Sequence, residues 1–157
     1  MKLDTIDLRI LAELQADGSL SNVELARRVH LSPSPCLARV KALEAAGVIQ
    51  RYVALANAAA LGLGLNVFIS ISLKTQSKEA LAAFEQSIAE HDQVMECYLM
   101  TGDSDYLIRV AVADISALER FILDQLTPIP GIEKIRTSFT LKQVRYKTAL
   151  PLPAARG

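Results

Sequence analysis

Two aspartates are the residues of this chain best placed to do chemistry. Asp103 and Asp105 stand one residue apart in the stretch TGDSDY, between two apolar runs. Paired carboxylates can transfer protons, ligate a hard cation or bind the ammonium group of a ligand. No histidine or second carboxylate cluster stands at a useful spacing, and the Asp-Ser-Asp triplet lacks the further oxygen ligands and glycine of a calcium loop. We therefore expect no catalytic residue, no metal and no cofactor, which leaves a turn or a binding site.

The composition is that of a globular chain. Hydrophobic residues form 51% of the 157 residues, and 17 basic residues balance 17 acidic ones. This is enough apolar surface for a core, and it creates no overall field that would attract nucleic acid or a membrane. The N-terminus lacks the apolar stretch of a signal peptide, and no apolar run is long enough to span a bilayer. Cys36 and Cys97 are far apart in the sequence, so we expect reduced thiols, a cytoplasmic protein and no membrane partner.

The first third of the chain carries the start and stop signals of three helices. Asp4 can cap the first helix, and the Asp17-Gly18 pair can end it. Ser21 and Glu24 form a capping-box pattern at the start of a short second helix. After a brief turn, Ser32-Pro33 can begin a third helix. We expect this third helix to bury Leu37, Val40 and Leu43, to end at Gly47, and to precede a short strand over 48–53.

Three helices with a tight turn between the second and third predict a winged-helix-like helix-turn-helix domain over residues 1–53. Local charge supports this, because residues 20–53 contain five basic and two acidic side chains, a net +3. The third helix begins SPSPCLARVK, with small polar residues in its first turn and basic residues after them. Such a helix can approach phosphates and base edges. The competing interpretation is a three-helix bundle with ordinary surface arginines.

The rest of the chain, over residues 66–150, alternates between strand and helix patterns after a linker at 54–65. Period-2 alternation predicts strands, and three-to-four spacing predicts helices. The expected order is a strand at 66–74, a helix at 77–90, strands at 94–101 and 106–112, a helix at 114–126 and a strand at 132–141. This β-α-β-β-α-β order predicts a ferredoxin-like sandwich, so the whole chain belongs to the α+β class.

The two faces of that predicted sheet differ. One face should meet the helices and include Met95, Cys97 as a buried core thiol, and Leu99. On the other face Glu96 and Arg109 can pair across strands. The same face also carries Phe68, Tyr98, Met100 and Leu107, which is more apolar than a wet sheet needs. We expect two such faces to pack together in a dimer, and a half-solvated sheet is the alternative.

At three places the chain resembles the Lrp/AsnC (leucine-responsive, feast/famine) family of transcriptional regulators. The matching stretches are LDTIDLRILAELQADGSLSNVELARRVHLSPSPCLARVKALEAAGVIQRY, VMECYLMTGDSDYLIRV and PGIEKIRTSF. Their order and spacing cover nearly the whole chain. The resemblance implies double-stranded DNA and a free amino acid as partners, and homodimers that assemble further, commonly into octamers. Serine at position 104 stands where the family varies and carries no information about the ligand.

The resemblance also implies which residues form the two sites. DNA contacts are expected at Ser32, Ser34, Pro35, Cys36, Arg39 and Lys41, with Arg27, Arg28 and Arg51 near phosphates. The effector site is expected at Thr101, Gly102, Asp103, Asp105 and Tyr106, with contributions from Tyr98, Met100, Asp114, Thr137, Ser138 and Thr140.

An α-amino acid is a zwitterion, and the TGDSD loop offers carboxylates for its ammonium and backbone N–H groups for its carboxylate. Leucine or methionine is the effector that the resemblance implies, and Tyr98 and Met100 can receive its apolar side chain. An anionic or cationic effector would need an opposing charge, which Arg109 or Asp114 could provide. Two other functions remain open. One is an architectural, nucleoid-type protein that wraps DNA with little sequence preference. The other is an amino-acid-sensing adaptor that acts through protein contacts.

Overall fold

A computed structural model describes residues 2–153, which form two compact units. The first unit runs to Leu55 and also includes the segment from Val144 onward, and the second spans Ala56–Gln143. In the first unit, the Gln15 side-chain amide exchanges hydrogen bonds of 2.6 and 3.2 Å with the backbone of Leu150. In the described chain no helix is both long and apolar enough to cross a membrane.

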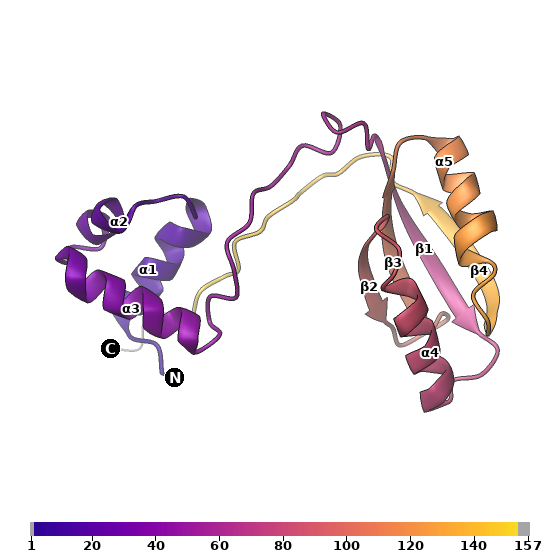
Figure 1. Cartoon of the computed structure of the whole chain (residues 1–157), viewed down its shortest axis with the longest axis horizontal. Coiled ribbons are helices and arrows are strands. Elements are labelled where there is room, and N and C mark those ends of the chain that lie inside the picture. Colours follow the sequence, from indigo (N-terminus) through magenta and orange to yellow (C-terminus); the bar gives the residue numbers. More distant parts are fainter. Residues whose placement is uncertain (1, 154–157) are drawn as a thin grey trace. The chain divides into compact units, whose positions relative to one another are not determined.

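The first unit contains the three predicted helices, α1 (Thr5–Ala16), α2 (Asn22–Arg28) and α3 (Pro33–Ala45) (Figure 1). Asp4 caps α1, as predicted, and accepts hydrogen bonds from two backbone N–H groups of the first turn. Ser21 caps α2, but Glu24 binds arginines instead of completing the capping box. The turn between α2 and α3 is tight because His30 adopts a left-handed conformation, with φ 58°.

The third helix differs from its prediction in which residues of its first turns face the core, and the segment that follows it is not a strand. Cys36, Val40 and Leu43 face the core, whereas Leu37 is 42% exposed, so the predicted buried stripe is wrong by one residue at its start. The helix ends as predicted near Gly47, whose φ of 70° suits glycine. The strand predicted at 48–53 is wrong. The described part of this unit offers it no partner strand, and a strand needs one to satisfy its backbone groups.

The second unit is the predicted β-α-β-β-α-β sandwich. Its four antiparallel strands lie in the order β2-β3-β1-β4. The elements are β1 (Leu65–Leu73), α4 (Lys78–Ile88), β2 (Val94–Leu99), β3 (Tyr106–Val112), α5 (Ile115–Arg120), which continues as a π-helical segment η1 (Phe121–Leu126), and β4 (Ile132–Phe139). Both helices cover the same face of the sheet (Figure 1).

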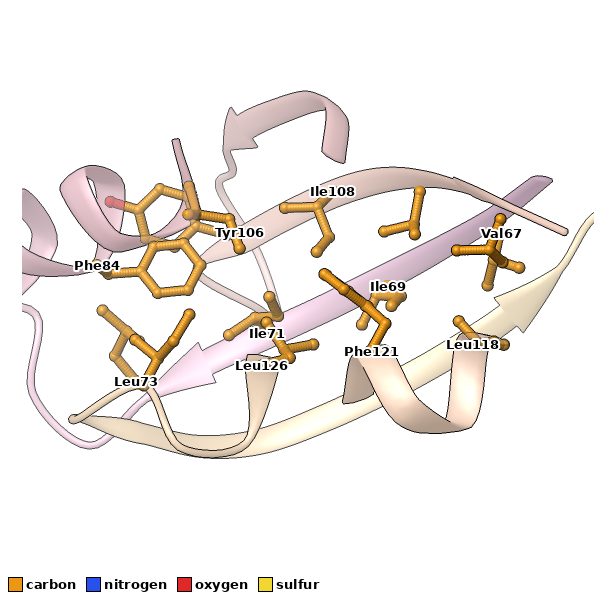
Figure 2. Packing of buried hydrophobic residues seen from close by; sticks show 14 residues of the cluster. Val67, Ile69, Ile71, Leu73, Phe84, Tyr106, Ile108, Leu118, Phe121 and Leu126 are labelled. Carbon is orange, nitrogen blue, oxygen red and sulfur yellow. The ribbon is translucent and has the colours of Figure 1, made fainter. Parts of the chain in front are cut away.

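The core of the sandwich lies between that face and the helices. Alternate residues of β1, such as Val67 and Ile69, are fully buried in a cluster that includes Leu118 and Phe121 (Figure 2). At the other end Phe84 of α4 stacks on Tyr106 with ring centroids 4.5 Å apart. This strict alternation explains why strand parity predicted the two faces of β1 and β3 correctly.

The edge strand β2 departs from prediction. Its register against β3 shifts between Val94 and Glu96, which breaks the alternation. Met95 is 52% and Leu99 60% exposed, and Cys97 is exposed too, so the prediction of a buried thiol there is wrong. The reason is incomplete cover, because α4 leaves a groove of about 280 Å³ alongside this edge. The predicted cross-strand pair is confirmed on the other face, where Arg109 Nε and Nη2 donate to Glu96 Oε1 at 2.9 and 2.7 Å.

Candidate functional sites

The exposed side of α3 is the surface of the first unit best suited to meet DNA. Ser34, Pro35 and Lys41 lie on it and are exposed. Ser32, at the N-cap, is exposed as well, and its hydroxyl makes no capping hydrogen bond. The backbone N–H groups of the first turn and these short side chains together form a surface that a phosphate or a base edge can approach closely.

Cys36 does not belong to that surface. Its side chain is 0% exposed and packs in the core of the helical unit, and burial raises the pKa of its thiol. The Cys36 side chain is therefore turned away from the surface predicted to meet DNA. The cause is the phase of α3, which turns positions 36, 40 and 43 inward and leaves 34 and 41 outward.

Arg39 is engaged within the protein. Its Nη1 donates to Asp4 Oδ2 at 2.7 Å and to Asp7 Oδ1 at 2.8 Å, and its side chain is 33% exposed. Asp7 is itself buried, with 4% exposure. The guanidinium therefore joins α3 to the N-terminus of α1, although sequence reasoning assigned it to DNA alone.

The arginines of α2 are also paired. Arg27 binds Glu24 at 2.7 Å, and Arg28 binds Glu24 at 2.9 Å and Glu13 at 3.1 Å. The hydrogen bonds from Arg27 and then Arg28 lower the pKa of the Glu24 carboxyl to about 2. Both arginines remain exposed. Two further cations, Lys41 and Arg51, are exposed and have no ion pair within residues 2–153.

In the second unit, the two aspartates of the β2–β3 hairpin have different surroundings. The Asp105 Oδ2 accepts a hydrogen bond of 2.7 Å from the backbone N–H of Leu73 and one of 3.3 Å from Gln76 Nε2. Its backbone N–H donates to Ile71 O at 2.9 Å, and its carbonyl accepts from Met100 N at 2.8 Å. Asp105 thus ties the hairpin tip to the end of β1.

Asp103 is exposed, and no hydrogen bond or ion pair engages its side chain among the residues that the structure describes. It lines a small polar hollow of about 30 Å³ together with Ser70, Ser72, Ser104, Lys134 and Arg136. The preceding Gly102 has φ 123°, a conformation that L side chains rarely adopt, and Thr101 is exposed beside it. Sequence reasoning did not select Lys134 and Arg136, although the register of β4 against Ser72 and Ser70 places them there.

Tyr106 points the other way. It is 1% exposed, lies in the sandwich core, and donates from its hydroxyl to Glu85 Oε1 at 2.7 Å. Burial, and then this hydrogen bond, raise the pKa of the phenol well above its usual range. The Tyr106 side chain is therefore turned away from the hairpin tip, because the alternation of β3 directs it toward α4.

The other predicted effector residues are dispersed over the second unit. Tyr98 and Met100 are 50% and 41% exposed near the hairpin tip. Asp114 caps α5, where its carboxylate accepts from Ala117 N at 2.7 Å. On β4, Thr137 pairs with Ile69 and Ser138 with Phe68, so their two side chains lie on opposite faces of the sheet. Just beyond the strand, the Thr140 hydroxyl is buried and has no hydrogen-bond partner among the described residues.

Both units match known families. Residues 66–150 match the Lrp/AsnC ligand binding domain, and residues 3–50 match a winged helix-turn-helix DNA-binding domain. The Bkd operon transcriptional regulator of Pseudomonas aeruginosa is 45% identical over 151 residues, covering 96% of this chain and 99% of that protein. The leucine-responsive regulatory protein of Escherichia coli K12 is 41% identical over 148 residues, covering 94% and 90%.

Solved structures agree. A transcriptional regulator of Neisseria meningitidis in complex with L-methionine has a TM-score of 0.91 and 41% identity, covering 96% of this chain and 97% of that one. The AsnC protein of Escherichia coli has a TM-score of 0.87 and 26% identity, covering 94% and 98%. These relatives are regulators, which confirms the expectation that the chain is not an enzyme. The chain belongs to the Lrp/AsnC family of DNA-binding transcriptional regulators, with an N-terminal helix-turn-helix and a C-terminal amino-acid-binding domain.

Proposed function

We propose that this regulator binds specific DNA sites, and that a free amino acid changes its affinity for them or its assembly. The observation that carries the proposal is the hairpin tip, where Asp103 is the one aspartate of the pair whose carboxylate no described residue engages. The ammonium group of an amino acid needs a free carboxylate, which Asp103 offers. Its carboxylate needs N–H donors, which the backbone of a loop that contains glycine can expose.

Leucine or methionine is the effector we favour. Met100 and Tyr98 expose apolar surface near the tip, and a neighbouring structure was solved with L-methionine while relatives are named leucine-responsive. The hollow beside Asp103, at about 30 Å³, holds no more than a small charged group. We therefore propose that the side chain of the effector lies outside it and that a second copy of the chain completes the pocket.

Assembly is part of the proposal. Phe68 and Leu107 on the open face of the sheet are only half-buried within one chain, and Tyr98 on the same face is more exposed. Packing of two such faces would remove this apolar surface from water. Homodimers that associate further, into an octamer, would link many helix-turn-helix heads, and avidity would then offset the weak binding of each head.

A thermal-shift screen of the twenty common amino acids tests the effector. A ligand present at about 100 times its Kd stabilises the folded protein by about 2.7 kcal/mol, which raises Tm measurably. We expect leucine or methionine to raise the Tm of the parent and to have no effect on Asp103→Ala. Stabilisation by glutamate or lysine alone would overturn the choice of effector, and stabilisation by none of the twenty would overturn the sensing proposal.

One observation favours a second candidate, a DNA-wrapping protein with little sequence preference. Beyond Ser34 and Lys41, the exposed positions of α3 include Ala38, Ala42 and Ala45, which carry no hydrogen-bond donors for base edges. Footprinting on genomic fragments separates the two functions. Discrete protected sites support the specific regulator, and protection spread evenly over every fragment supports the wrapping protein.

A further inference from the structure

We propose that Arg39 is a positioning residue, which anchors the recognition helix α3 to the start of α1 and makes no phosphate contact. The DNA-binding activity of the family places α3 at the nucleic acid, but it does not say which side chains of α3 touch it. The contacts of Arg39 are two carboxylates of its own chain, Asp4 at 2.7 Å and Asp7 at 2.8 Å.

Both carboxylates are also held by hydrogen bonds that do not involve Arg39. Asp4 Oδ1 accepts from the N–H groups of Ile6 and Asp7 at 2.9 Å each, and Asp7 Oδ2 accepts from Asp4 N at 3.1 Å. This is a capping box formed by two aspartates. In each aspartate one carboxylate oxygen accepts the hydrogen bonds of the helix cap and the other binds the guanidinium. The cap of α1 therefore also fixes the two carboxylates in the positions in which they bind Arg39.

Burial and charge argue against a phosphate contact at the same place. Asp7 is the one buried charged side chain among residues 2–153, and removal of its cation would leave it uncompensated. Asp4, Asp7 and Arg39 together carry a formal charge of −1, which repels phosphate at short range. The exposed positions of α3 that bear no such anions, Ser34 and Lys41, lie outside this triad and are left to meet DNA.

A double-mutant cycle with Asp4→Asn and Arg39→Met tests the proposal. Asparagine caps a helix as well as aspartate does, so Asp4→Asn removes charge and keeps the cap. DNA affinity is measured by fluorescence anisotropy with a mixed-sequence duplex of about 30 base pairs, roughly three helical turns, over a series of salt concentrations. Lys41→Met is the matched control, because Lys41 is exposed and unpaired in the described structure.

We expect Asp4→Asn and Arg39→Met each to weaken binding by roughly fivefold, the low end of ordinary coupling between sites. The second substitution should add little to the first, because both break one anchor. The slope of log K against log salt should stay that of the parent. In Lys41→Met the slope should fall by about 0.9 for each head bound to the duplex, as expected for the loss of one phosphate contact per head.

Tighter binding by Asp4→Asn in the parent, with no such gain in the Arg39→Met background, would overturn the proposal, because it would mean that Asp4 restrains the Arg39 cation from reaching DNA. A fall in the salt slope of Arg39→Met by about 0.9 for each bound head would do the same. Should Arg39→Met fail to fold by circular dichroism, the sign of the Asp4→Asn effect decides alone, since that variant retains its helix cap.

Discussion

Replacement of Asp105 by alanine should destabilise the sandwich, even though Asp105 stands in a loop expected to bind a ligand. Its carboxylate accepts a 2.7 Å hydrogen bond from the backbone N–H of Leu73, and the Leu73 side chain is 2% exposed. A hydrogen bond to a charged group contributes about 1.5–3 kcal/mol, and a buried N–H without a partner costs about as much. We therefore expect the free energy of unfolding to fall by about 2–3 kcal/mol.

Thermal unfolding without effector measures this. For a domain of this size 1 kcal/mol corresponds to about 4–8 °C, so Tm should fall by roughly 8–24 °C. The matched variant is Asp103→Ala, which removes an exposed carboxylate of the same hairpin and should stay within about 0.5 kcal/mol of the parent. Equal stability of the two variants would show that the bond to Leu73 contributes little, and Asp105 would again be a candidate ligand contact.

Two further predictions concern the helical unit and the thiols. The lowered pKa of Glu24, about 2 against an ordinary 4.5, means that its ionised form stabilises the fold above the ordinary pKa and that this contribution is lost as pH falls toward 2. The Tm difference between parent and Glu24→Gln should therefore shrink from about pH 6 to about pH 2.5, and a constant difference would contradict the ion pair. In native protein, maleimide should label exposed Cys97 and spare Cys36 until unfolding, as checked by mass spectrometry of peptides; the reverse order would contradict the phase of α3.

The sequence could predict the architecture because its signals are local. Alternation sorts the faces of β1 and β3, and caps such as Asp4 and Ser21 mark where helices begin. It could not predict the rotational phase of α3, because Cys36 and Leu37 are both apolar and tertiary packing against α1 and α2 chooses between them. Nor could it predict that α4 leaves the edge strand β2 incompletely covered, so that Cys97 is exposed.

The candidate sites were harder to predict for a related reason. Residue type does not say which partner a charged side chain will find. Asp103 and Asp105 are the same residue type in the same loop. Asp103 is exposed, whereas the Asp105 carboxylate accepts a hydrogen bond from the backbone N–H of Leu73 at the end of β1. Likewise Arg39 is a plausible DNA contact by type and position, and the two carboxylates that bind it lie more than thirty residues earlier in the chain.

The proposed function requires that an amino acid bound at the hairpin tip changes how the helix-turn-helix head holds DNA. The most direct test measures the DNA affinity of the parent and of Asp103→Ala by anisotropy, each with and without leucine and methionine, with light scattering on the same samples to follow assembly. We predict that one of the two amino acids changes the affinity or the assembly of the parent, and that Asp103→Ala binds DNA normally but no longer responds. An unchanged response in Asp103→Ala would contradict the proposal that the hairpin tip senses the amino acid.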